Sequence, residues 1–296
     1  MMKKPLIAVA VSMALASVAQ AETKFYGKMN VAVGYDEASE KAGVDSFASR
    51  LGVKGSSELG STTVIYQAEY ETDIDGDGTV LKQRDSYVGL QYAGFGTVKM
   101  GVMDTPLKKS QGKFDLFNDV IDMKKVIEAE NREANTLNYT TEKLGDLQVS
   151  ASVVFAEDGT SDGYSANAIY KAGGTFAGVG YDTKIDGLES TIRATIIQKV
   201  GDLSFGALIN QVDSADVPAG ADELAFAVNA SMKMGNNTLK AQLESGDQQE
   251  VGAQSLSFGA DHKMAKTTKA YLYVNQFESD TTDSNTTIAL GLEHKF

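Results

Sequence analysis

Beyond residue 22, apolar residues alternate with small or polar ones along most of the chain. In the segment 223–234, for example, Leu224, Phe226 and Val228 recur at every second position. A period of two is typical of β-strands that have one face in apolar surroundings and the other in water. No segment shows the period of 3.6 residues that a long amphipathic helix would need. The pattern therefore predicts an all-β fold.

The alternating segments number sixteen, and the connections between them are of two kinds. Short turns, often with glycine, alternate with longer and mostly acidic loops, and both prolines after residue 21, Pro106 and Pro218, fall in connections. Tight turns at one end and longer loops at the other predict a transmembrane antiparallel β-barrel of sixteen strands. We expect these strands at 23–35, 47–56, 61–72, 83–92, 96–102, 135–142, 146–156, 163–172, 175–182, 190–199, 202–212, 223–234, 237–246, 252–264, 267–278 and 285–296.

A soluble β-sandwich or a β-solenoid is the main alternative fold. A sandwich of this length would normally form two domains, but no linker or change of composition divides the chain, and no repeat of fixed period supports a solenoid. A sheet in lipid has to close, because lipid offers no hydrogen bonds to a free strand edge. We therefore expect residues 22–296 to form a single barrel domain.

The first 21 residues have the features of a secretory signal peptide. Lys3 and Lys4 precede an apolar stretch at 6–18, and Ala19-Gln20-Ala21 fits the rule of small residues at the cleavage site. We expect this segment to be removed, so that the barrel begins at residue 22.

Composition excludes several classes of function. The chain has no cysteine, which rules out disulfide scaffolds, cysteine-bound metals and thiol nucleophiles. It has 27 basic and 40 acidic residues; without residues 1–21, which hold two lysines and no acidic residue, the formal charge is −15. Such an excess of negative charge disfavours nucleic acid as a partner, because phosphate binding needs a basic surface.

Several motifs together resemble the general diffusion porins of Gram-negative outer membranes, which are trimeric and sixteen-stranded. The order and spacing of the motifs are more specific than any one of them, and the strand count extends the resemblance over the whole of 22–296. The motifs are Phe25-Tyr26-Gly27-Lys28, Ser49-Arg50-Leu51-Gly52-Val53-Lys54-Gly55, Arg84-Asp85-Ser86-Tyr87-Val88-Gly89-Leu90, and the end of the chain, Gly291-Leu292-Glu293-His294-Lys295-Phe296.

The resemblance implies that the long connection at 103–134 is a third loop that folds into the lumen and narrows the channel. It also implies a basic wall opposite this loop, with Lys28, Arg50 and Arg84 at the matching positions. Strand parity independently aims Lys28 and Arg50 inward, where water avoids the cost of about 2–4 kcal/mol for a charge in hydrocarbon. Parity is ambiguous for Arg84, and we expect Arg132, at the end of the loop, to join the basic group.

The facing acids of the loop are expected to be Asp115, Asp119 and Asp122. A basic wall against an acidic loop would create a transverse electric field at the narrowest point of the channel. Val102 stands where many porins have an arginine, and the chain is acidic overall, so we expect a weak preference for cations. An exposed loop surface without a role in transport is the other interpretation of these charges.

Other candidate sites are weaker. Asp73, Asp75 and Asp77 resemble the start of a calcium-binding loop, but the twelfth position is Arg84 instead of the glutamate that binds calcium, so they make only a weak metal candidate. The two histidines, His262 and His294, lie on the apolar parity of their strands. No catalytic group, cofactor motif or metal-ligand spacing is visible, and we expect no enzyme activity and no cofactor.

These observations predict an outer-membrane homotrimer that lets small hydrophilic solutes and ions diffuse passively through a water-filled barrel. Its other partners would be outer-membrane lipid and lipopolysaccharide. The alternative is a structural or adhesive barrel that only anchors acidic surface loops. A silent barrel in a planar bilayer would favour that alternative.

Overall fold

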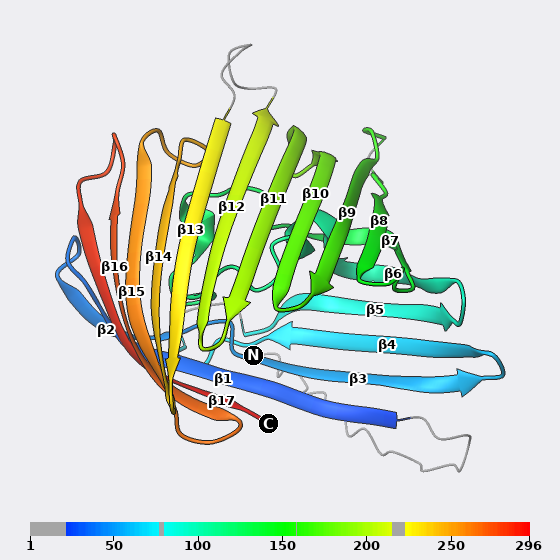
Figure 1. Cartoon of the computed structure of the whole chain (residues 1–296), viewed down its shortest axis with the longest axis horizontal. Coiled ribbons are helices and arrows are strands. Elements are labelled where there is room, and N and C mark those ends of the chain that lie inside the picture. Colours follow the sequence, from blue (N-terminus) through cyan, green and yellow to red (C-terminus); the bar gives the residue numbers. More distant parts are fainter. Residues whose placement is uncertain (1–21, 77–79, 158, 215–222) are drawn as a thin grey trace, which may run out of the picture.

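The computed structural model describes residues 22–76, 80–157, 159–214 and 223–296. Within these ranges, all strands belong to one antiparallel sheet, which closes because its last strand pairs with its first (Figure 1). The predicted signal peptide at 1–21 lies outside the described residues. The fold is a closed sixteen-stranded β-barrel, as the sequence pattern predicts.

The described residues form seventeen strand segments and two short helical turns. The helical turns are α1 (Pro106–Lys109) and the 3₁₀ turn η1 (Met123–Lys125). The strands are β1 (Glu22–Asp36), β2 (Lys41–Ser46), β3 (Arg50–Leu59), β4 (Thr62–Glu71), β5 (Lys82–Tyr92), β6 (Gly96–Asp104), β7 (Arg132–Thr141), β8 (Leu147–Val154), β9 (Gly163–Ala172), β10 (Thr175–Ile185), β11 (Leu188–Val200), β12 (Leu203–Ser214), β13 (Glu223–Met234), β14 (Asn237–Gly246), β15 (Ala253–Lys263), β16 (Thr268–Glu278) and β17 (Asn285–Lys295).

Segments β2 and β3 are two halves of one interrupted strand, which explains why seventeen segments make sixteen strand positions. Both halves pair with β1, β2 along 31–36 and β3 along 22–28. The prediction that all of Asp36–Ser46 is a loop is therefore wrong. Val44 and its neighbours continue the sheet, because the long strand β1 offers backbone partners there.

A serine side chain repairs the interruption between the two halves. The hydroxyl of Ser49 accepts a hydrogen bond from the Asn30 amide at 3.0 Å and donates one to the Asn30 carbonyl at 3.2 Å. The Phe47 amide donates to the same carbonyl at 2.9 Å. A buried backbone needs hydrogen-bond partners for its N–H and C=O groups. Ser49 and Phe47 supply them to Asn30, although no continuous strand lies opposite it. Phe47, which lies in the break, packs against a buried cluster that includes Phe117 and Ile121 of the β6–β7 connection.

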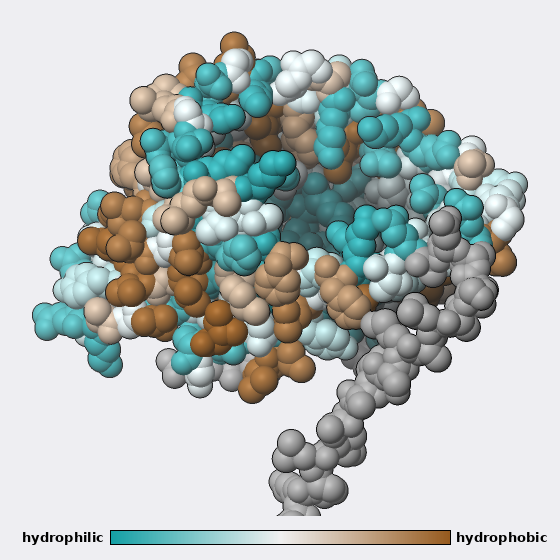
Figure 2. All heavy atoms as spheres, turned by 90° about the horizontal axis from the view of Figure 1, so that it is seen from below, coloured by the Kyte–Doolittle hydropathy of each residue, from teal (hydrophilic) through white to brown (hydrophobic). Residues whose placement is uncertain are grey.

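The two faces of the barrel wall differ in polarity. Large apolar side chains such as Phe226 and Leu290 are 46% and 61% exposed on the outward parity. The inward parity carries polar side chains such as Asn210, Gln242 and Ser257, which are at most 2% exposed. In Figure 2, hydrophilic residues surround a hollow and hydrophobic ones gather on the outer surface. This arrangement suits a wall with lipid outside and polar groups inside.

The connection between β6 and β7, residues 105–131 and here called the β6–β7 segment, packs against the inward face of the wall. Phe114, Met123 and Ile127 of the segment form a buried cluster with Leu208 of β12 and Ala227 of β13. Among the described residues, no helix is long and apolar enough to cross a membrane.

Two glycines of β10 let α1 lie directly against the wall. A Cβ atom on Gly178 would overlap the backbone of Ser110, and one on Gly180 would lie 2.7 Å from the Cα of Leu107. The Asn167 amide of β9 donates to the Pro106 carbonyl at 2.6 Å, and the Leu107 amide donates to the Ser165 hydroxyl at 3.1 Å.

We predict that Gly178→Val destabilises the barrel by about 1–3 kcal/mol, because the larger side chain overfills a packed contact. Chemical unfolding in detergent micelles measures this. Ala177→Val, which places the same side chain on the outward face of the same strand, is the control. Equal stability of the two variants would contradict the tight contact between α1 and β10.

Candidate functional site

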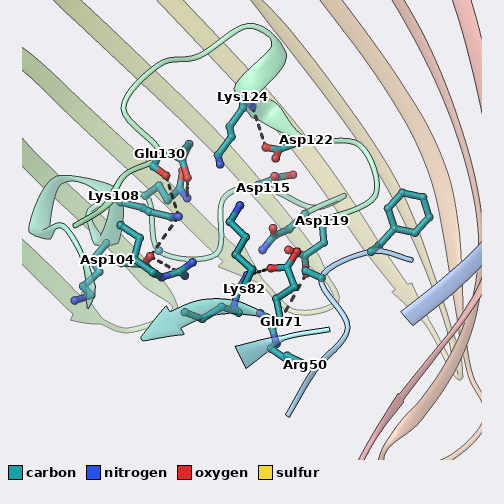
Figure 3. A pocket seen from close by; sticks show the side chains of 18 of the residues that line it. Arg50, Glu71, Lys82, Asp104, Lys108, Asp115, Asp119, Asp122, Lys124 and Glu130 are labelled. Atoms are coloured by element: carbon teal, nitrogen blue, oxygen red, sulfur yellow. Dashed lines mark hydrogen bonds and ion pairs between the residues drawn. The ribbon is translucent and has the colours of Figure 1, made fainter. Parts of the chain in front are cut away.

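A cavity of about 510 Å³ lies between the β6–β7 segment and the strands that carry the predicted basic wall. Its charged side chains come from both sides and point toward one another (Figure 3). The lining includes seven basic and six acidic residues: Arg50, Lys82, Arg84, Lys108, Lys109, Lys124 and Arg132, with Glu71, Asp104, Asp115, Asp119, Asp122 and Glu130.

Lys28, Arg50 and Asp119 meet at one side of this cavity. The Lys28 ammonium lies 2.5 Å from the Asp119 carboxylate, and the Arg50 guanidinium lies 3.8 Å from it. Lys28 is only 4% exposed, so its charge depends on this partner. Asp119 has a φ of +73°, a left-handed conformation that is uncommon for a residue other than glycine. The structure thus joins a predicted loop acid to two predicted wall residues.

Arg84 also points inward, and a β-bulge is the reason. Ala68 pairs with Ser86 but Tyr70 pairs with Gln83, so β5 has one extra residue opposite Glu69. A bulge resets the alternation of side chains, which removes the conflict of parity seen in the sequence. The guanidinium of Arg84 binds Glu69 at 2.8 Å and Glu71 at 2.5 Å. Its partners are therefore acids of the wall itself.

Arg132 and the first turn of the β6–β7 segment form a second ionic group. The Arg132 guanidinium lies 2.7 Å from Asp85 and 2.8 Å from Asp104, and Lys108 lies 3.3 Å from the same Asp104 carboxylate. Asp85 shares the strand parity of Tyr87 and the buried Gly89, so it faces inward beside Arg84. Arg132 does line the cavity, but it is neutralised by acids of β5 and β6.

The other two predicted loop acids differ from Asp119. Asp122 caps the 3₁₀ turn by accepting a hydrogen bond from the Lys124 amide at 3.0 Å. Asp115 accepts hydrogen bonds from the Phe117 amide at 3.0 Å and from Gln242 of β14 at 3.2 Å. Burial, followed by the nearby Glu244, raises the pKa of Asp115 to about 8. Asp115 is therefore largely protonated at neutral pH and adds little negative charge.

Arg193 of β11 was not among the candidates from the sequence, although it makes the most contacts to the β6–β7 segment of any wall arginine described. It is 0% exposed and forms an ion pair with Glu130. It also donates to the Glu128 carbonyl at 2.6 Å and to the Gln111 side chain at 3.2 Å. Its Nε donates to Asn210 at 2.9 Å. Its position on the polar parity of its strand was the available signal.

Val102 is half-buried in β6. The register sets it opposite Ser86 and two residues from Met100, which is 54% exposed, and it does not line the cavity. Asp104, two residues further along the strand, does line the cavity.

The weak metal candidate gains no support. Asp75 accepts a hydrogen bond from the Ser46 amide at 2.5 Å, and Asp77 lies outside the described residues. Within the described ranges, no group of three or more His, Cys, Asp or Glu side chains could hold a metal ion. His262 and His294 are exposed on the outward parity, where they contact Asn237 and Thr268.

Solved structures of bacterial porins share this fold. An anion-selective porin from Comamonas acidovorans superposes with a TM-score of 0.79 at 20% identity, covering 94% of this chain and 100% of that one. OmpF of Salmonella typhi in complex with daunomycin superposes with a TM-score of 0.76 at 14% identity, over 93% of this chain and 97% of that one. OmpT of Vibrio cholerae in its trimer form superposes with a TM-score of 0.73 at 16% identity, over 93% of this chain and 99% of that one.

Sequence comparison leads to the same group of proteins. The major outer membrane protein P.IB of Neisseria gonorrhoeae is 28% identical over 60% of this chain, and the match spans 56% of that relative's length. The family model described as Gram-negative porin matches residues 8–282. The chain therefore belongs to the Gram-negative porin family, whose members are channels of the outer membrane and not enzymes.

Proposed function

We propose that this protein forms a water-filled channel through which small hydrophilic solutes and ions diffuse passively. The observation that carries this proposal is the charged cavity inside a closed barrel whose outward face is apolar. Twelve charged side chains and the largely protonated Asp115 in one cavity need water, and lipid outside the wall cannot supply it. Family membership supports the same conclusion.

The β6–β7 segment is proposed as the constriction of this channel. It contacts inward side chains of β1, β11, β13 and β14, which supports a position across the lumen. Arg50, Arg84 and Arg132 would then border the narrow passage from the wall, and Asp119 and Asp122 from the segment. Lys28 would lie buried behind Asp119. Solutes would meet closely spaced charges of both signs there.

A weak cation preference remains our prediction for ion selectivity. The acidic excess of the whole chain supports it. The charges of the cavity keep this cation preference weak, because seven basic side chains there face six acidic ones and Asp115 is largely neutral. We further propose that the protein works as a homotrimer embedded in lipid and lipopolysaccharide, supported by the trimeric form of the structurally similar OmpT.

We expect the purified protein to give stepwise conductance in a planar bilayer, with a reversal potential that shows a weak cation preference under a salt gradient. Heat-modifiable migration in detergent gels and mass by light scattering test the trimer. A barrel that folds and inserts without conductance would instead support an anchor for acidic surface loops. A clear chloride preference would contradict the predicted ion selectivity alone.

Arg193→Met should weaken the attachment of the β6–β7 segment and raise single-channel conductance. Removing one partner of a buried ion pair costs about 3–5 kcal/mol, because the other charge stays buried without compensation. Conductance should be measured in 1 M salt, where fixed charges are screened. A rise under these conditions reports a wider passage and not a changed electric field in the channel. Lys99→Met, which removes a positive charge from the wall of β6, is the control, and equal conductance of both variants would argue against Arg193 as an anchor.

The raised pKa of Asp115 predicts a pH dependence of stability. Because the folded protein keeps a proton that the unfolded chain releases, this group lowers the free energy of unfolding as pH rises from about 4 to about 8. Asp115→Asn should remove that part of the pH dependence. Chemical unfolding at several pH values measures it, with the exposed Asp280→Asn as control. Identical pH profiles for Asp115→Asn and the native protein would refute the assignment.

A further inference from the structure

The end of the barrel that carries the longer connections is strongly acidic. In an antiparallel barrel with short turns at one end, all of these connections gather at the other end. Their described parts contain eleven acidic residues and no lysine or arginine. These parts are residues 37–40, 72–76, 80–81, 155–157, 159–162, 186–187, 247–252 and 279–284.

The opposite end carries a row of lysines on the part of its rim from β9 to β17. Five successive strands that run toward the short turns, β9, β11, β13, β15 and β17, each have a lysine as their last or second-last residue. All five side chains are exposed. This partial ring is here called the lysine ring and consists of Lys171, Lys199, Lys233, Lys263 and Lys295.

All five positions share the inward parity. Lys199, for instance, lies four residues after the buried Thr195, and Lys233 lies four residues after the buried Asn229. Lys295 pairs with Glu293 at 3.0 Å, while the other four form no ion pair within the described residues. The short turns add two lysines and three acidic residues, so lysines outnumber acids at this end. The lysine ring therefore borders the lumen where the channel opens beside the short turns.

The charge along the barrel axis thus changes sign. One mouth is acidic, the cavity in the middle is nearly balanced, and the other mouth is basic. Fixed charges at a pore mouth attract mobile ions of the opposite sign. Cations would gather at the loop end and anions at the lysine ring, with a zone between them that favours neither ion.

We infer that this channel rectifies, and that its ionic current is larger when the loop side is at the positive potential. At that polarity the field drives cations inward from the acidic mouth and anions inward from the lysine ring, so both ions accumulate in the middle and carry more current. The reverse polarity draws both ions out and depletes the middle. This inference rests on the proposed channel function, and it adds the polarity at which the ionic current is larger.

Screening sets the conditions under which rectification is visible. The Debye length is about 30 Å at 0.01 M salt and about 3 Å at 1 M. The charges of the two mouths therefore act on ions throughout the lumen at the lower salt concentration and hardly at the higher one. We expect unequal currents at equal and opposite voltages in 0.01 M KCl, and equal currents in 1 M KCl.

The test compares two double variants in planar bilayers with the same salt on both sides. Lys199→Gln with Lys233→Gln should bring the ratio of the two currents in 0.01 M KCl toward one, because it weakens the lysine ring. Lys41→Gln with Lys184→Gln removes the same charge from the ends of strands at the loop side, and it should leave the ratio unchanged or larger.

The orientation of the channel can be set independently, because the chain has no cysteine. A Lys266→Cys variant carries a single thiol in the short turn between β15 and β16. A thiol-reactive polymer that is too large to enter the pore labels this thiol only when it is added to the side of the bilayer that the short turns face. A current that is larger with the loop side negative, symmetric currents in 0.01 M KCl, or equal ratios for the two double variants would overturn the inference. A complete lack of conductance would count against the channel itself.

Discussion

Closure of the sheet is the constraint on which the rest of this structure depends. Lipid cannot hydrogen-bond a free strand edge, so β1 has to pair with β17, and it does so in unbroken register from Lys28 to Asp36. The need is strong enough to shape local detail. Where the strand opposite β1 is interrupted, the hydroxyl of Ser49 takes over the hydrogen bonds of the Asn30 backbone. Closure also separates an outside that contacts lipid from an inside that can hold water and charge.

Two different kinds of contact hold the β6–β7 segment against the inward face of the wall. Apolar side chains such as Phe114 pack on small residues of β13, and glycines of β10 let the backbone of α1 approach closely. Buried ionic contacts at Arg193 and Lys28 then fix the two flanks. Apolar packing supplies most of the affinity in such a contact, whereas paired charges specify one position.

Charge in this barrel is organised on two scales. Within the cavity, acids and bases alternate over a few ångströms, so that Asp119, Glu69 and Glu71 largely neutralise the basic wall. Along the axis, the acidic loops and the lysine ring lie at opposite ends, too far apart to neutralise one another. Short-range pairs are barely affected by salt, whereas the axial asymmetry depends on it. The two patterns therefore have separate consequences for solutes and for ions.

The sequence by itself determined the fold class, the strand positions to within a few residues except for β2, which it assigned to a loop, and the inward aim of Lys28 and Arg50, because side-chain parity follows directly from a period of two. Only the tertiary structure decided the rest of the site. A single extra residue in β5 turns Arg84 inward against its parity. The burial of Asp115 against Gln242 and the contacts of Arg193 with Glu128 and Glu130 join residues about 60 to 130 positions apart. Local alternation cannot specify such contacts, because they depend on where the chain returns after closing the barrel.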